Sequence, residues 1–219
     1  MSSEIARFNM IEQQIRPWNV LRTEVLETLA DVPREAFVPA HLQGLAYSDT
    51  DIPLNAAGAV MMSPKVEAKL VHDLELAGSE KVLEIGTGSG YSTALLARHA
   101  NQVVSVEIDA ELAAAAVKRL ADLGVDNAKV IHGDGALPET TAGHGPFDAI
   151  VLSGSVGEVP EQLLHLLKPN GRLLCICGDE PIMQATLCTP SNAQQSRRVL
   201  WDMNAPRLQG FADSPAFVF

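Results

Sequence analysis

The chain has 219 residues, 47% of them hydrophobic, and a formal net charge of −11 at pH 7. This length allows one large hydrophobic core. The negative charge argues against nucleic acid or an anionic membrane as a partner, and no apolar run reaches the roughly 18 residues needed to cross a bilayer. The first residues lack the basic-then-apolar order of an export signal, so we expect a cytoplasmic protein.

The first 80 residues predict helices on either side of an irregular segment. Apolar residues recur at helical spacing in residues 4–15 and 20–29, two helices that we expect to join near Pro17. Residues 32–65 are rich in proline, glycine, alanine and aspartate and show no long period, which is typical of a functional loop region. A further helix should begin at Pro64, with Ser63 as its N-cap.

Strand and helix signals alternate through the rest of the chain. Strands are expected at 81–85, 103–108, 128–132, 147–152 and 172–177, and helices at 91–99, 110–123 and 159–167. This alternation predicts an α/β fold, a mostly parallel doubly wound sheet with helices on both faces. Segments 183–189, 197–203 and 214–219 indicate short strands, including antiparallel ones at the sheet edge. We expect residues 1–79 to pack, as helices and a loop, on a core of residues 80–219 within one structural unit.

The stretch KVLEIGTGSGY, residues 81–91, predicts a nucleotide-binding turn. A buried strand leads into Gly86, Gly88 and Gly90, and then into a helix. Glycine lets the backbone adopt positive φ and approach a ligand closely, next to the free N–H groups of a helix start. Glu107 ends the following strand, where a carboxylate can accept both hydrogen bonds of a ribose diol.

A dinucleotide would fit the same turn, but two features favour S-adenosylmethionine. The third glycine of the G-x-G-x-x-G fingerprint is absent, and Glu84 inside the strand would repel a pyrophosphate. The same carboxylate suits the ammonium and sulfonium groups of S-adenosylmethionine. Asp134, followed by Gly135, ends the third strand and can accept a hydrogen bond from an adenine amino group; the alternative is a simple turn aspartate.

The remaining chemistry-bearing residues indicate no metal site. Cys175, Cys177 and Cys188 form no CxxC pair and are interpreted as small buried hydrophobes, and the histidines have no ligand spacing. The fourth strand ends in Ser153, Gly154 and Ser155, which are small enough to leave room for a substrate.

Seven segments together resemble the protein-L-isoaspartate O-methyltransferase family: MIEQQIR, VPREAFVP, AYSDTDIPL, VLEIGTGSGY, VEI, GDG and LLKPNGRLL. The resemblance covers nearly the whole chain. It implies a Rossmann-like methyltransferase core with N- and C-terminal additions, S-adenosylmethionine as the donor, and isoaspartyl-containing peptides or proteins as substrates for repair. The acceptor of such an enzyme is a carboxylate, already ionised at neutral pH, so no general base is required.

By position, the resemblance implies that Glu84 and the glycine turn hold the methionine end of the donor, that Glu107 holds the ribose, and that Asp134 with Gly135 meets the adenine. The full set of predicted donor-site residues is Met62, Glu84, Gly86, Thr87, Gly88, Ser89, Gly90, Glu107, Ile108, Asp134 and Gly135.

The chain departs from the family in its irregular loop. Where the family has a glycine followed by Gln-Thr-Ile-Ser, this chain has Gly58 followed by Ala59-Val60-Met61-Met62, so the site serine of the family falls on Met62, and Ser63 and Pro64 come next. This removes a hydroxyl expected to orient the acceptor carboxylate. Ser63 is a weak candidate substitute, and Lys65 adds a cation nearby.

Three hypotheses follow from an intact donor half and an altered acceptor half. The first, favoured by the overall resemblance, is methylation of isoaspartyl carboxylates. The second is a methyltransferase of the same fold that acts on another acceptor. The third is a protein that binds S-adenosylmethionine without catalysis.

Overall fold

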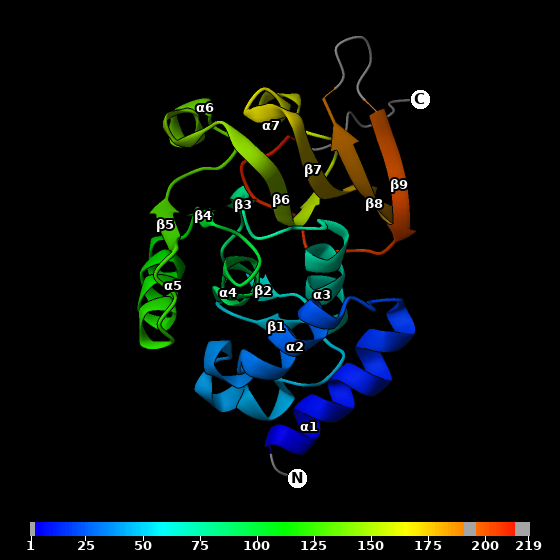
Figure 1. Ribbon diagram of the computed structural model, residues 1–219. Coiled ribbons are helices and arrows are strands. Elements are labelled where there is room, and N and C mark those ends of the chain that lie inside the picture. Colours follow the sequence, from blue (N-terminus) through cyan, green and yellow to red (C-terminus); the bar gives the residue numbers. More distant parts are fainter. Residues whose placement is uncertain (1–2, 191–195, 213–219) are drawn as a thin grey trace.

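The computed structural model describes residues 3–190 and 196–212 and is built around a seven-stranded sheet in the order β5-β4-β3-β6-β7-β8-β9 (Figure 1). β5 to β7 are mutually parallel, whereas β8 and β9 are antiparallel additions at one edge. The strands are β3 (Lys81–Ile85), β4 (Gln102–Glu107), β5 (Ala128–His132), β6 (Phe147–Val156), β7 (Leu167–Asp179), β8 (Ile182–Thr189) and β9 (Ser196–Asp202). The predicted mixed α/β fold is confirmed.

Helices cover both faces of the sheet (Figure 1). On one face lie α3 (Pro64–Asp73), α4 (Tyr91–Ala97) and α5 (Ala110–Asp122), and on the other lie α6 (Pro138–Thr141) and α7 (Glu161–Leu164). Val82 packs in the cluster with α3 and α4, whereas its neighbour Leu83 packs in the cluster with α7. Successive strand residues point to opposite faces, so a strand covered on both sides reads as a continuous apolar run.

The boundary between α7 and β7 differs from the prediction. The expected helix over 159–167 is only four residues long, and β7 begins at Leu167 instead of residue 172. Leu167 already pairs with Phe147 of β6, and a register shift separates this pair from the next, Ala149 with Arg172. Because Leu167 pairs with β6, it belongs to β7 and cannot extend α7. The predicted strand at 214–219 lies outside the described residues.

The N-terminal helices are α1 (Ser3–Met10), the π-helical turn η1 (Ile11–Ile15), the 3-10 turn η2 (Arg16–Trp18) and α2 (Thr23–Asp31). The helix predicted over 4–15 therefore changes pitch at Ile11. Ile11 and Ile15 are buried, but Ile5 and Phe8 are 53% and 63% exposed. A wider turn holds more residues, so it shifts the apolar face between the two halves of the segment.

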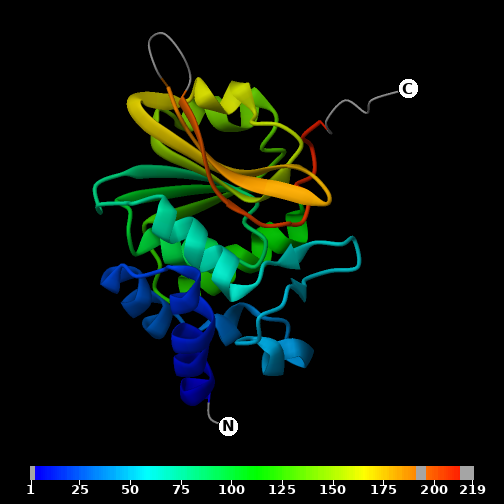
Figure 2. The same cartoon turned by 90° about the vertical axis from the view of Figure 1, so that its right-hand side faces the viewer.

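Residues 32–63 are irregular, as predicted, with two 3-10 helices, η3 (Arg34–Phe37) and η4 (Ala40–Leu45), and a small hairpin of β1 (Ile52–Pro53) and β2 (Val60–Met61). The Asn55 side chain shapes the hairpin loop, because its Oδ1 accepts hydrogen bonds from the N–H groups of Ala57 and Ala59, both at 3.0 Å. Its Nδ2 donates to Asp109 at 2.9 Å. The hairpin is thus tied to the start of α5, at one end of the sheet (Figure 2).

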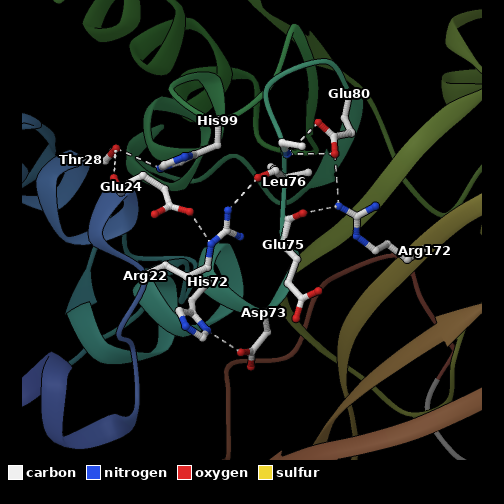
Figure 3. A network of polar contacts seen from close by, with 11 residues as sticks. Arg22, Glu24, Thr28, His72, Asp73, Glu75, Leu76, Glu80, His99 and Arg172 are labelled. Atoms are coloured by element: carbon white, nitrogen blue, oxygen red, sulfur yellow. Dashed lines mark hydrogen bonds and ion pairs between the residues drawn. The ribbon is translucent and has the colours of Figure 1, made fainter.

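The N-terminal helices share one hydrophobic core with the sheet, since Leu29 and Phe37 pack in the same cluster as Val82 and Leu174. Polar contacts join the same parts (Figure 3): Arg22 Nη2 donates to the Leu76 carbonyl at 2.9 Å, and Thr28 Oγ1 lies 3.0 Å from His99 Nε2. Within residues 3–190 and 196–212, no helix is long and apolar enough to span a bilayer.

Candidate active site

An open cavity of ≈ 690 Å³ lies at the carboxyl ends of β3, β4 and β6. The chain reverses its strand order here, because β3 has β4 on one side and β6 on the other, and ligands of open α/β sheets bind at such a point. The lining residues are Gly58, Ala59, Val60, Met62, Ile85, Gly86, Gly88, Val106, Glu107, Ile108, Gly135, Ser153, Pro206, Arg207, Leu208 and Gln209.

The glycine turn has the predicted backbone conformation, with φ of 93° at Gly86, 52° at Gly88 and 89° at Gly90. Gly86 and Gly88 line the cavity. Gly90 is instead turned toward α5, where a Cβ on it would lie 3.2 Å from Ala116. Gly90 therefore permits close helix packing behind the turn rather than ligand contact.

Glu107 lies in the cavity wall at the end of β4 and is 6% exposed. Its Oε2 accepts a hydrogen bond from the Gly88 N–H at 2.7 Å, and its Oε1 accepts one from the Asp109 N–H at 3.0 Å. These two bonds orient the carboxylate and leave a further lone pair on each oxygen. The geometry suits a pair of ribose hydroxyls, and this role stays a prediction.

Glu84 does not lie where the sequence analysis expected it. Its side chain is fully buried beneath the glycine turn and does not line the cavity. Its carboxylate accepts hydrogen bonds from Thr93 Oγ1 at 2.5 Å, Ser105 Oγ at 2.7 Å and Ser153 Oγ at 2.8 Å. Burial raises the pKa of Glu84 to about 7. Of these three partners only Ser153 lines the cavity.

Asp134 forms the turn after β5, where its Oδ1 accepts a hydrogen bond from the Ala136 N–H at 2.9 Å. Gly135, not Asp134, lines the cavity. Gly210 packs directly on the Asp134 carboxylate, since a Cβ on Gly210 would lie 2.3 Å from Asp134 Oδ1. The turn role is therefore present in the structure, and contact with adenine stays a prediction.

Residues 205–210, here called the C-terminal strap, cross the carboxyl ends of the strands and form a wall of the cavity that the sequence analysis missed (Figure 2). The strap pairs with Ser155 on β6: the Ser155 N–H donates to the Pro206 carbonyl at 2.7 Å, and the Leu208 N–H donates to the Ser155 carbonyl at 2.8 Å. A Cβ on Gly86 or Gly154 would lie 2.8 Å from the Leu208 side chain. Of the room predicted for a substrate above residues 153–155, the part above Gly154 is therefore filled by Leu208, whereas Ser153 still lines the cavity.

Met62 lies between the main cavity and a second cavity of ≈ 230 Å³, and it lines both. The second cavity is rich in hydroxyl groups, from Thr87, Ser89 and Ser92, and includes the buried carboxylate of Glu67. The loop residue Met62 therefore borders the glycine turn, and its match to the serine position of the family stays a prediction.

Ser63 and Lys65 do not supply the missing hydroxyl or a free cation. Ser63 precedes α3 as predicted but makes no capping hydrogen bond with its side chain, and its N–H donates to Asp51 at 2.7 Å. The Lys65 ammonium pairs with Asp49 at 2.8 Å and lies 4.8 Å from the Trp18 ring centroid. Neither side chain lines a cavity.

Arg34 supports the Met62 loop from below, which the sequence analysis did not foresee although Arg34 lies in VPREAFVP. The side chain is fully buried. Its Nη2 donates to the Met62 carbonyl at 2.6 Å, its Nε donates to the Ala46 carbonyl at 2.8 Å, and its Nη1 pairs with Glu67. The guanidinium therefore joins the loop to α3.

Cys175 and Cys177 share one face of β7, as predicted, with their sulfur atoms 3.8 Å apart. In the part of the chain that the structure describes, no group of three or more potential ligands could hold a metal ion.

The fold, the glycine turn and the acidic residue at the end of β4 define a Rossmann-like methyltransferase, the class that uses S-adenosylmethionine. The model of the protein-L-isoaspartate(D-aspartate) O-methyltransferase family matches residues 6–199. The chain belongs to this family, whose members methylate isoaspartyl-containing proteins.

Relatives and solved structures agree with this assignment. The chain is 40% identical to protein-L-isoaspartate O-methyltransferase 2 of Pelobacter propionicus over 84% of this chain and 80% of the relative. It is also 40% identical to the Brucella anthropi enzyme, over 84% and 83% of the two chains. A crystal structure of a protein-L-isoaspartate O-methyltransferase from Plasmodium falciparum with S-adenosyl-L-homocysteine has the same fold, with a TM-score of 0.76, 22% identity and coverage of 95% and 99%.

Proposed function

We propose that this enzyme methylates the free carboxylate of isoaspartyl residues in peptides and proteins, with the donor in the main cavity and the acceptor at the Met62 loop. The observation that carries the proposal is the composition of the cavity wall. Gly86, Gly88 and Glu107 line it together with Gly58, Ala59, Val60 and Met62 of the irregular loop. Donor and acceptor can thus meet at one opening.

The donor residues divide by position. Glu107 accepts hydrogen bonds from the ribose, while Ile108 and Gly135, which also line the cavity, pack against the adenine. Gly86, Gly88 and Ser153 face the amino-acid end, and Thr87 and Ser89 line the second cavity behind it. Glu84 and Gly90 support the turn without touching the ligand.

The reaction needs no general base. An oxygen of the ionised acceptor carboxylate attacks the sulfonium methyl group in line, a C–O bond forms, and the C–S bond breaks with its electron pair left on sulfur. The products are a methyl ester and S-adenosylhomocysteine, and no proton moves. Positioning of two reactants and exclusion of water then supply the rate, an effect of several kcal/mol where geometry is tight. Attraction between carboxylate and sulfonium falls as the charges cancel, so it favours binding more than the transition state.

A methyl-transfer assay tests the proposal, with labelled donor and either an isoaspartyl peptide or its normal aspartyl twin. We expect label only on the isoaspartyl peptide, in a base-labile ester that releases methanol. A stable product on another acceptor would favour a different methyltransferase activity. Donor binding without turnover on any acceptor would favour a non-catalytic protein, and either result contradicts the proposal.

A further inference from the structure

Glu84 is a buried carboxylate without a cationic partner. It lies at the carboxyl end of the central strand β3, is 0% exposed, and forms no ion pair with any residue that the structure describes. Buried charges in proteins are normally paired, because an isolated ion loses its hydration. Among the described residues, three hydroxyl groups donate hydrogen bonds to the Glu84 carboxylate, and a cationic ligand bound next to it would supply the missing positive charge.

The three hydroxyls approach Glu84 from three elements: Thr93 from α4, Ser105 from β4 and Ser153 from β6. Thr93 and Ser105 are buried, whereas Ser153 is half-buried and lines both cavities. A hydroxyl has one hydrogen and two lone pairs. When Ser153 donates its hydrogen to Glu84, only its lone pairs remain for a ligand, and they suit a group that donates hydrogen bonds.

The methyl donor carries such a group, the ammonium of its amino-acid end. We propose that Ser153 accepts a hydrogen bond from this ammonium and that Glu84, directly behind Ser153, releases a proton to solvent as the donor binds. The inference rests on the proposed function, because it takes S-adenosylmethionine as the ligand of the main cavity.

The electrostatics of the surrounding groups agree with this coupling. Burial raises the pKa of Glu84 to about 7, against the opposing effect of its three hydroxyl partners. The charged group that acts on it from α3 is Glu67, which raises the pKa further and is itself paired with Arg34 of η3. Near pH 7 the empty protein thus holds Glu84 partly protonated, and a cation in the cavity lowers this pKa.

Isothermal titration calorimetry of S-adenosylmethionine near neutral pH, in two buffers of different ionisation enthalpy, counts the protons released. We expect net release, and donor affinity that rises with pH from about 6 to about 8 by at most about tenfold per unit. 5′-Methylthioadenosine, which keeps the nucleoside and lacks the amino-acid end, should bind without proton release.

Variants of Glu84 and Ser153 test whether the proton released on donor binding comes from Glu84. Glu84→Gln should bind the donor without proton release and with no pH dependence over this range. Ser153→Ala should weaken donor binding about tenfold, the value of one hydrogen bond to a charged group, and Ser153→Thr should restore it. Asp148→Asn is the matched control, because Asp148 lies at the opposite end of β6, paired with Lys168 at 2.8 Å, and should leave proton release unchanged.

The outcomes separate the two proposals. Absence of donor binding to the wild-type protein would overturn the proposed function. Donor binding without proton release, or release that persists in Glu84→Gln, would overturn this inference alone. If Glu84→Gln does not fold, the wild-type comparison still decides, because equal release with 5′-methylthioadenosine would overturn the role of the amino-acid end.

Discussion

At the scale of single residues, Met62 is the position at which we predict that the acceptor half of the site departs from its family. Its side chain is 3% exposed and lines both cavities, as do Gly86 and Gly88 of the glycine turn. A thioether fills this position but cannot donate a hydrogen bond to a carboxylate.

Met62→Ser tests whether a hydroxyl limits the activity. We expect kcat/KM for an isoaspartyl peptide to rise about tenfold, because a hydrogen bond to a charged group contributes about 1.5–3 kcal/mol. Steady-state kinetics with the labelled donor measure this change. Met61→Ser, one residue away, is the control and should give no gain; unchanged kinetics in Met62→Ser would contradict the explanation.

Arg34 acts on the same loop from beneath. Lysine keeps the charge but lacks the planar fork that reaches the Met62 carbonyl, the Ala46 carbonyl and Glu67 together. Arg34→Lys should therefore raise the KM for the peptide about tenfold and change the donor affinity little. The variant should also lose about 3 kcal/mol in the free energy of unfolding. Peptide kinetics and donor titration on the folded fraction check this, and equal losses of both affinities would indicate a purely structural role.

At the scale of elements, the C-terminal strap completes the cavity by pairing with Ser155, which lies about 50 residues earlier in the chain. The pairing of the strap with β6 requires a glycine at position 154. A Cβ there would lie 2.8 Å from the Leu208 side chain and 3.0 Å from the Pro206 carbonyl oxygen. From the sequence, these small residues predict space for a substrate. Only the path of the strap shows which group fills it.

Gly154→Val should displace the strap and weaken donor binding about tenfold, since a wall of the cavity moves and its contacts are lost. Donor titration measures the affinity, and hydrogen exchange at the Leu208 amide reports whether the strap still pairs with β6. Gly143→Ala is the control, because nothing lies within 4 Å of a Cβ there. Unchanged exchange and affinity in Gly154→Val would show that the strap is not part of the site.

At the scale of the whole molecule, we expect the buried Glu84 carboxylate beneath the glycine turn to lower the free energy of unfolding. The pKa of Glu84 is raised from 4.5 to about 7 by burial. The folded state therefore holds a proton that the unfolded chain has lost, so stability falls as pH rises from about 4.5 to about 7. Above that range the loss is constant, at most about 3 kcal/mol.

Glu84→Gln should remove this loss. We expect the empty variant to be more stable than the wild-type protein at pH above about 7, and equally stable near pH 4.5, where both side chains are neutral in the folded state. Urea unfolding at several pH values measures the difference. A variant whose stability follows the wild-type pH profile throughout would show that another group is responsible.

The sequence alone determined the α/β fold, the glycine turn, the acidic residue at the end of β4 and the family, because strand and helix periods and positive-φ glycines are properties of short segments. Only the tertiary structure decided that Glu84 lies behind Ser153, that Arg34 holds Met62, and that Leu208 fills the space above Gly154. Each of these contacts joins segments that lie far apart in the chain. Such contacts depend on how the layers pack around one core, and no local pattern of residues encodes that packing.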